Sequence, residues 1–398
     1  MEKGYLALIL HAHLPFVRHP ELEHGALEEY WYYEAMLETY LPLIKMMEDL
    51  YSEGTEFKLT MVLSPTLTAM FKDQLLQERF GEHLERSIIL AKKELDRRAQ
   101  DPERKPLAKM YHHLFTEARE IYHSYQGDLT TAFSRFQGLS SLELITCAAT
   151  HSYLPLISTE EGKRAQIGLA VDQHTEVYGE RPRGFWLPEC GYRQGLERII
   201  GDYGLEYFCL EHHGLLYAAP RPKYGPFSPI ITPAGVAAFG RDPESSKQVW
   251  SASEGYPGDY QYREFYRDIG YEEELDYLQP FFPDGFRKQT GIKYHRITGP
   301  GGNKEIYNQE EGRRKAEIHA GNFIFNRQQQ INFLADRMDG VKPLITAPYD
   351  AELFGHWWFE GPVWLKEVLR KSAADQRDYQ LITPGEYLDQ NPKLQLGI

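Results

Sequence analysis

The sequence has few cysteines and no long apolar run. Its three cysteines are too few for a disulfide framework and lack the spacing of metal ligands, which excludes a disulfide-rich secreted fold and a cysteine metal site. Cys147, Cys190 and Cys209 each stand in an apolar stretch, as buried thiols of a reducing compartment do. No segment approaches the ~20 apolar residues that span a membrane.

Basic residues are also in short supply. Lys and Arg number 44 against 58 Asp and Glu, and the net charge of −14 argues against nucleic acid, whose phosphates need basic surfaces. The N-terminal apolar run, Leu6 to Leu10, ends in polar His-Ala-His without a cleavage site, which favours a buried strand over a signal peptide. We therefore expect a cytoplasmic protein, monomeric or weakly homo-oligomeric, with no membrane and no nucleic-acid partner.

Short apolar runs alternate with segments of helical periodicity along most of the chain. The expected strands cover residues 6–10, 58–63, 142–148, 184–186, 207–210, 292–297 and 344–347. The expected helices include residues 27–51, 163–178, 195–203 and 317–338. Strands that alternate with helices form a mostly parallel sheet, and this many of them favour an α/β fold closed into a barrel.

One segment interrupts this alternation. Residues 75–136 are rich in charge and helical throughout, so we expect them to form a helical insertion subdomain. Residues 1–74 and 137–398 would then form one discontinuous catalytic barrel. Residues 232–302, dense in Gly, Pro, Tyr and charge, form a long connection of the kind that is more often functional than idle.

Polar residues follow several of the expected strands, where a β/α barrel has its active site. They are His11, His13, His151, Glu189 and Asp350. Two carboxylates among neutral hydrogen-bonding groups suit glycosidic-bond cleavage, in which one attacks C1 and the other protonates the leaving oxygen. Taken singly, each carboxylate could also be a helix cap or a solvated charge, and the His-x-His pair could bind zinc as well as sugar.

The segments around these residues carry more information. They are His11-Ala-His-Leu-Pro-Phe16, Trp186-Leu-Pro-Glu-Cys-Gly-Tyr192 and Ala347-Pro-Tyr-Asp-Ala-Glu-Leu-Phe-Gly-His-Trp-Trp358. They resemble, in order, three signature segments of glycoside hydrolase family 57, and His151-Ser-Tyr-Leu-Pro155 is similar to a fourth. Similarity to the family's branching-enzyme subgroup rests on Gly240-Arg-Asp-Pro243, Gly255-Tyr-Pro-Gly-Asp259 and Tyr262-Arg-Glu-Phe-Tyr-Arg-Asp268. The resemblance runs from the first strand to about Leu369.

The resemblance implies a distorted (β/α)7 barrel with a helical insertion and a retaining mechanism that needs no metal and no other cofactor. Glu189 would be the nucleophile and Asp350 the general acid/base. The residues implied to bind the substrate, an α-glucan such as amylose or a glycogen-like chain, are His11, His13, His151, Trp186, Arg267, Phe354 and Trp357. The implied function is 1,4-α-glucan branching, which cleaves an α-1,4 bond and forms an α-1,6 branch in glycogen- or starch-type metabolism.

Two features depart from the branching-enzyme pattern. The chain ends at Ile398, before the C-terminal helical domain that such enzymes carry. The segment Gly235-Val-Ala-Ala-Phe239 also lacks the tyrosine expected at the tip of a loop over the cleft. Both features are expected to expose the glycosyl-enzyme to water and to raise hydrolysis relative to transfer.

Three alternatives stay open on the sequence. An α-amylase or a 4-α-glucanotransferase would use the same residues on the same substrate. A metal-dependent polysaccharide deacetylase is indicated by His11-Ala-His13, although its first-strand motif calls for a carboxylate where this chain has His11. A non-catalytic glucan-binding protein is the third.

Overall fold

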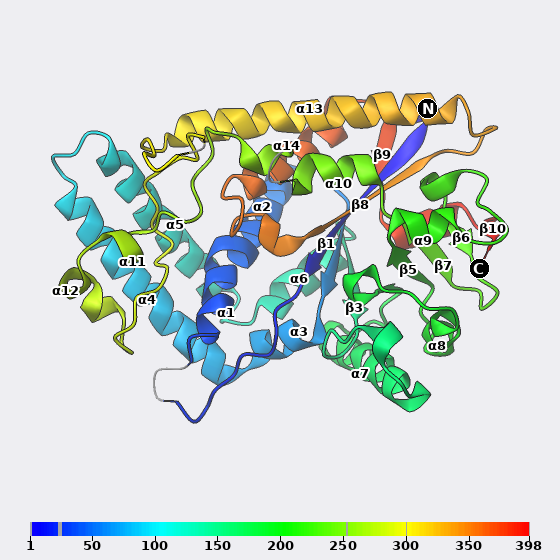
Figure 1. Ribbon diagram of the computed structural model, residues 1–398, viewed down its shortest axis with the longest axis horizontal. Helices are drawn as coiled ribbons and strands as arrows, with labels where there is room; N and C mark the ends of the chain where they lie inside the picture. The colour runs from blue at the N-terminus through cyan, green and yellow to red at the C-terminus, as the bar shows by residue number, and fades with distance from the viewer. Residues whose placement is uncertain (1, 23–25, 252–253, 300, 398) are drawn as a thin grey trace.

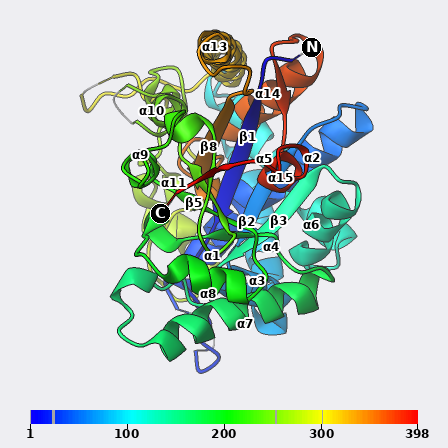
Figure 2. The ribbon, with the colours of Figure 1, turned by 90° about the vertical axis from the view of Figure 1, so that its right-hand side faces the viewer.

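A curled parallel sheet forms the centre of the computed structural model, which describes residues 2–22, 26–251, 254–299 and 301–397 (Figure 1). Its main strands are β1 (Gly4–Ala12), β2 (Leu59–Leu63), β3 (Leu142–Cys147), β4 (Gly184–Trp186), β5 (Tyr207–Leu210), β7 (Ala237–Gly240) and β8 (Leu344–Asp350). They pair in the order β7-β5-β4-β3-β2-β1-β8, and every neighbouring pair is parallel. Figure 2 shows β8, β1, β2 and β3 side by side.

The sheet is joined across its two ends just beyond β7. The backbone N–H of Asp242 donates to the carbonyl of Thr346 in β8 at 2.8 Å. Seven parallel strands with helices around them confirm the predicted α/β fold, a distorted (β/α)7 barrel. Three short strands extend it: β6 (Ile230–Ile231) lies antiparallel to β7, β10 (Gln395–Leu396) pairs with β6, and β9 (Tyr379–Leu381) pairs with β1.

Burial on both faces explains why the strands are apolar runs rather than alternating ones. All nine residues of β1 are buried. Leu6, Leu8 and Leu10 enter the core beneath the helices, while Tyr5, Ala7 and Ile9 enter the barrel interior together with residues of β3, β4 and β5. Successive side chains point to opposite faces of a strand, so β1 contributes to both cores.

The helices cover the outside of the barrel and extend it at one end. They are α1 (Glu29–Ala35), a π-helical turn (Met36–Tyr40), α2 (Leu41–Ser52), α3 (Pro65–Lys72), α4 (Gln74–Arg97), α5 (Arg104–Ser124), α6 (Leu129–Gly138), α7 (Glu160–Tyr178), α8 (Leu196–Asp202), α9 (His212–Leu216), α10 (Pro243–Trp250), α11 (Ile269–Glu272), α12 (Leu275–Leu278), α13 (Gln309–Ala335), α14 (Gly361–Ala374) and α15 (Pro384–Gln390). Helices α4 and α5 pack on each other at one end of the long axis, opposite β6 and β10 (Figure 1). Among the described residues, no helix is both long and apolar enough to cross a membrane.

The expected insertion corresponds to α4, α5 and α6. Because α6 also packs against β3 of the barrel, the boundaries 75 and 136 stay a prediction. The three cysteines are buried free thiols, as expected.

Two sequence expectations are wrong. Residues 292–297 form only isolated bridges, His295 with Ile306 and Arg296 with Arg263, instead of a strand. The segment 235–239, expected to be a loop over the cleft, instead leads at Gly235 and Val236 into β7, whose residues are all buried. The turn before β7 follows the antiparallel strand β6 and lies at the amino end of β7, opposite the catalytic ends of the parallel strands. A tyrosine at Ala237 would therefore enter the barrel wall and could not cover a cleft.

Candidate active site

The register of β1 and β8 brings the first predicted site residues together. His11 is the partner of Asp350 across this pair of strands. Its Nδ1 lies 3.2 Å from Asp350 Oδ1, and the Asp350 side chain keeps 44% of its surface exposed. The carboxylate therefore combines a fixed partner with access to a ligand.

Three imidazoles and an indole form a stack beside Asp350. His151 Nε2 lies 3.1 Å from His11 Nε2. The rings of His13 and His151 are stacked at 3.8 Å, and His13 Nδ1 lies 3.0 Å from Ser64 Oγ, which also caps α3. Trp186 stacks on His11 at 5.0 Å and is almost wholly buried, so it supports the stack from the barrel side.

Burial keeps two rings of this stack, His13 and His151, uncharged. Desolvation, with smaller contributions from His151 and His11, lowers the pKa of His13 to about 3. Desolvation and the neighbouring His11 lower the pKa of His151 to about 4, against the opposing attraction of Asp350. Both rings are therefore neutral at pH 7, and a neutral imidazole can donate one hydrogen bond and accept another, as sugar hydroxyls require.

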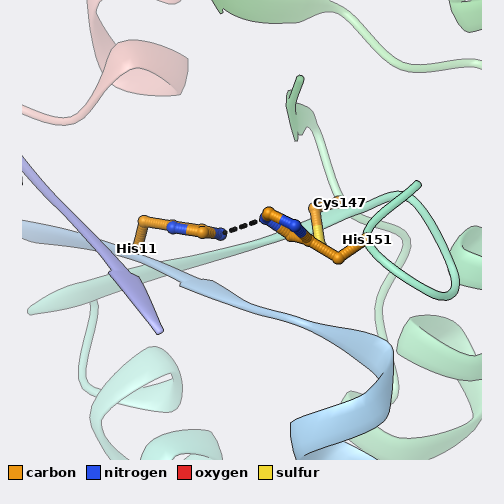
Figure 3. A group of neighbouring side chains, drawn as sticks. All are labelled: His11, Cys147 and His151. Carbon is orange, nitrogen blue, oxygen red and sulfur yellow. Dashed lines mark hydrogen bonds between the residues drawn. The ribbon is translucent and has the colours of Figure 1, made fainter. Parts of the chain in front are cut away.

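His11 and His151 also lie close to a thiol (Figure 3). The possible ligand atoms of His11, Cys147 and His151 all lie within 4.8 Å of one another. Burial raises the pKa of the Cys147 thiol and keeps it protonated, whereas a cysteine that binds a metal is a thiolate. The expectation of no metal stays a prediction.

Glu189 follows β4 in a tight turn of unusual backbone conformation. Glu189 and Cys190 have φ of 55° and 52°, and His151 has φ of 53°. Left-handed non-glycine residues cost on the order of 1–3 kcal/mol each and gather at active sites. The turn is closed by Cys190 N–H, which donates to the carbonyl of Leu187 at 2.8 Å, and it leaves Glu189 exposed between buried neighbours.

The buried Cys190 thiol lies near charged groups that follow or end several of the parallel strands. Burial raises its pKa to about 12, and the charges that act on it belong to Arg241, Glu211, Asp350 and Glu189. Glu189 follows β4 and Asp350 ends β8, so the parallel order of the strands places both predicted catalytic carboxylates at the carboxyl end of the barrel. Arg241 follows β7 and pairs at 2.9 Å with Glu211, which follows β5. Glu211 also forms a possible metal-ligand group with His212 and His213.

The loop after Asp350 is clamped onto the π-helical turn. Glu352 Oε1 accepts from the Tyr40 hydroxyl and, at 3.1 Å, from the His13 backbone N–H. His356 Nδ1 lies 2.7 Å from Glu38 Oε2. Gly355 has φ of 112°, and a Cβ there would collide with the carbonyl of Glu38, so only glycine fits.

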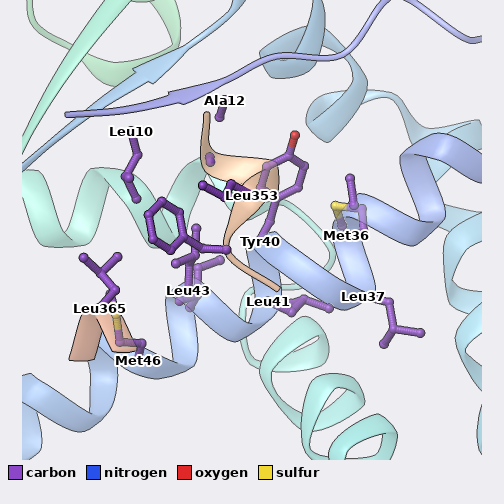
Figure 4. Close-up of a cluster of buried hydrophobic side chains, with 14 of the residues drawn as sticks. Leu10, Ala12, Met36, Leu37, Tyr40, Leu41, Leu43, Met46, Leu353 and Leu365 are labelled. Carbon is purple, nitrogen blue, oxygen red and sulfur yellow. The ribbon is translucent and has the colours of Figure 1, made fainter. Parts of the chain in front are cut away.

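A buried apolar cluster lies beneath this clamp (Figure 4). It joins Leu10 and Ala12 of β1 and Leu353 of the loop with Tyr40 and with apolar residues of α2, among them Leu41, Leu43 and Met46. Desolvation raises the pKa of Glu352 to about 8, so its carboxyl is mostly neutral at pH 7.

The remaining residues predicted to bind substrate differ in exposure and in their contacts. Trp357 is 54% exposed and stacks on Phe265 at 4.5 Å, which gives a flat aromatic surface near the loop. Phe354 is completely buried between Trp358 and Trp364, so the expectation that it binds substrate is corrected: it packs the loop. Arg267 bonds to Glu272 and to the Gly302 carbonyl, and its contact with a glucan stays a prediction.

Sequence reasoning missed the residues that hold the site in place. They are Glu38, Tyr40, Ser64, Arg241 and Glu352. Glu352 and Arg241 lie inside the recognised segments, which gave a signal for them. Nothing in the sequence pattern marked Glu38, Tyr40 or Ser64, whose partners are 318, 312 and 51 positions away.

Comparison with known proteins extends these observations. Residues 7–307 match the model of glycosyl hydrolase family 57. A 1,4-alpha-glucan branching enzyme of Thermococcus kodakarensis is 33% identical over 98% of this chain, which spans 58% of that enzyme's length. An α-amylase structure from Thermotoga maritima has a TM-score of 0.94 and 42% identity, with 99% of this chain and 76% of that one covered.

A second solved structure, a branching enzyme from Pyrococcus horikoshii, has a TM-score of 0.86 and 31% identity, with 100% of this chain and 72% of that chain covered. The family match covers more than half of the chain, and it includes the segments that carry the histidines and Glu189. The resemblance predicted from the motifs is thereby confirmed. The chain belongs to glycosyl hydrolase family 57.

Proposed function

We propose that this chain is a retaining α-glucan enzyme and that its reaction is 1,4-α-glucan branching, with amylose or a glycogen-like chain as substrate. The observation that carries the proposal is the pair Glu189 and Asp350 at the carboxyl end of a family 57 barrel, beside a stack of imidazoles in which His13 and His151 are neutral at pH 7. The similarity to branching enzymes over nearly the whole chain supports the choice of reaction.

Glu189 and Asp350 divide the chemistry between them. In the first step the Glu189 carboxylate attacks C1 while Asp350 gives its proton to the leaving O4, which forms a glycosyl ester and a shortened chain. In the second step Asp350 takes the proton of an incoming 6-hydroxyl, whose oxygen attacks C1 and releases Glu189. The left-handed turn after β4 leaves Glu189 exposed for this role.

His11 can keep one tautomer through both steps. His11 Nδ1–H can donate to Asp350 Oδ1 at 3.2 Å, and His151 Nε2–H can donate to His11 Nε2 at 3.1 Å. Asp350 Oδ2 would then give its proton to O4 in the first step and take one from the incoming 6-hydroxyl in the second. The pair would thus support Asp350 as acid and as base.

Hydrolysis by an α-amylase is the second candidate. The identity of 42% to the Thermotoga maritima α-amylase favours it, because that value exceeds the 31% to the Pyrococcus horikoshii branching enzyme. The two reactions share the glycosyl-enzyme and differ only in whether water or a sugar hydroxyl resolves it. Exposed Trp357, stacked on half-buried Phe265, offers a surface on which an acceptor chain can stack.

The cellular setting belongs to the same proposal. Three buried cysteines that form no disulfide are typical of a reducing compartment, which supports a cytoplasmic location. We infer that the enzyme acts there in glycogen-type synthesis. We keep the expectation of a monomer or weak homo-oligomer.

Incubation with amylose tests the proposal. The expected products contain new α-1,6 linkages, seen as short chains after enzymatic debranching, and iodine staining falls without a matching rise in reducing ends. The Glu189→Gln variant serves as the control and should leave the amylose unchanged. A rise in reducing ends without new branches would replace branching by hydrolysis, and new α-1,4 chain lengths alone would indicate 4-α-transfer.

A further inference from the structure

Lys293 is a buried cation that the proposed reaction does not use. Its side chain is 0% exposed, and its Nζ donates to Gln289 Oε1 at 2.8 Å. The carboxylates near it in the described part of the chain, Glu38, Asp268 and Glu34, act on it through charge without a hydrogen bond. Lysine is almost never fully buried without an ion pair, because a desolvated ammonium costs free energy. Its closest contacts should therefore explain why a lysine stands there.

The ring of Phe265 is one of these contacts. Nζ of Lys293 lies 4.3 Å from the centre of this ring, within the range of a cation–π interaction. Phe265 is half-buried and also stacks on Trp357, with ring centres 4.5 Å apart and planes inclined by 24°. Trp357 keeps 54% of its surface exposed. Because a desolvated cation attracts an aromatic face more strongly than a hydrated one, Lys293 helps to fix the ring on which Trp357 rests.

Lys293 also stabilises a second contact that orients Trp357. His356, the residue before Trp357, lies with its Nδ1 2.7 Å from Glu38 Oε2. Burial acts to raise the pKa of Glu38, but the charge of Lys293, the hydrogen bond with His356 and the charge of Arg263 lower it to about 2. Glu38 is therefore a carboxylate at pH 7 and attracts the His356 imidazole. One buried cation thus acts on both contacts that hold Trp357.

Phe265 and Trp357 form an aromatic platform close to the proposed acid/base. Asp350 must reach the oxygen that joins the donor sugar to the next one, and Trp357 belongs to the loop that follows Asp350. A glucan that extends from this oxygen can meet the exposed face of Trp357. We propose that Lys293 is a positioning residue, which sets the affinity for the glucan by fixing the aromatic platform. This inference rests on the proposed function only in that the ligand is an α-glucan.

The test measures the affinity of the full chain for maltoheptaose by calorimetry, in a Glu189→Gln parent that should leave the ligand intact. Lys293→Met keeps an unbranched side chain and removes the cation, and it should raise Kd about three- to tenfold. Lys288→Met is the matched control. Lys288 is also buried, with its Nζ 3.6 Å from the centre of the Tyr30 ring, but Tyr30 does not belong to the platform. Its replacement should change Kd by less than about twofold.

A double-mutant cycle separates positioning from a general loss of stability. Trp357→Ala removes the exposed face of the platform and should raise Kd about tenfold. Adding Lys293→Met to Trp357→Ala should then change Kd by less than about twofold, because Lys293 acts through Trp357. Circular dichroism checks that the variants are folded. If Lys293→Met does not fold, Lys293→Gln, which is neutral but still forms hydrogen bonds, serves in the same comparisons.

The outcomes distinguish this inference from the proposed function. No binding of maltoheptaose by the Glu189→Gln parent would overturn the proposed substrate and this inference together. Binding by the parent with an unchanged Kd for Lys293→Met would overturn this inference alone. An equal rise in Kd for Lys288→Met, or additive effects of Lys293→Met and Trp357→Ala, would do the same.

Discussion

Glu352 offers a sharp test of how the site is held, because one of its oxygens joins two elements. Oε1 accepts from Tyr40, which is fully buried, and from the backbone of His13. Glu352→Ala leaves both donors without this partner. With about 1–2 kcal/mol for each, the loss is roughly 2–4 kcal/mol, or about 2–5 °C in Tm for a chain of this length. Release of the loop that carries Asp350 should also lower kcat by about 10- to 100-fold.

Glu352→Gln is the matched control, since it keeps an acceptor oxygen and resembles the neutral carboxyl that prevails at pH 7. It should retain Tm within about 2 °C and kcat within about threefold. Calorimetry and initial rates on amylose measure both. If the alanine and glutamine variants behave alike, the two hydrogen bonds do not hold the loop.

The raised pKa of Glu352 adds a pH test with a definite sign. The folded carboxyl titrates near 8 and the unfolded one near 4.5, so its contribution to stability is complete below pH 4.5 and is lost as the pH rises to about 8. Glu352→Gln lacks this loss. The stability of Glu352→Gln relative to wild type should therefore rise between pH 5 and 8, by on the order of 1–3 kcal/mol in the free energy of unfolding, and its Tm should rise with it. A flat difference would contradict the assignment.

Three further predictions address the clamp, the histidines and the metal question. Gly355→Ala should lower kcat more than 10-fold and reduce Tm, because its Cβ collides with Glu38. The control Gly340→Ala, at φ of 83° in open space, should lower the stability by only about 1 kcal/mol. Equal effects of the two substitutions on kcat would refute the clamp. The pKa values of His13 and His151 are lowered to about 3 and 4, so their contribution to stability is present above pH 6.5 and is lost as the pH falls through these values. In a series of melting curves, the Tm of His13→Asn should therefore fall less than that of wild type between pH 6.5 and pH 4. Dialysis against EDTA should leave activity on amylose unchanged, and a loss that zinc restores would revive the deacetylase alternative.

The strand ends could be predicted from sequence because an apolar run that stops at a polar residue is a local signal. The expected strands at residues 184–186 and 207–210 agree with β4 and β5 at both ends. β7 escaped because Ala-Ala-Phe-Gly has weak strand propensity and takes its structure from its neighbours in the barrel. Residues 292–297 were predicted to form a strand, but their burial comes from packing against α5, where Tyr111 donates to the carbonyl of Lys293.

The candidate site divides in the same way. His11, His13, His151, Glu189 and Asp350 could be found because each lies at or soon after the carboxyl end of a strand. The partners that fix them are distant in sequence, and pairs such as Glu38 with His356 exist only once the π-helical turn has packed against the loop. Such contacts depend on the whole fold, which local pattern does not contain.

Trapping of the glycosyl-enzyme tests the assignment of the nucleophile most directly. In Asp350→Asn the first step can proceed with α-maltosyl fluoride, because fluoride leaves without a proton, while the second step lacks its base and slows. Mass spectrometry of the digested protein should then find one maltosyl group on the peptide that contains Glu189, and none in the double variant with Glu189→Gln. A maltosyl group on another residue, or fluoride release without any covalent adduct, would contradict the double-displacement mechanism and the role of Glu189.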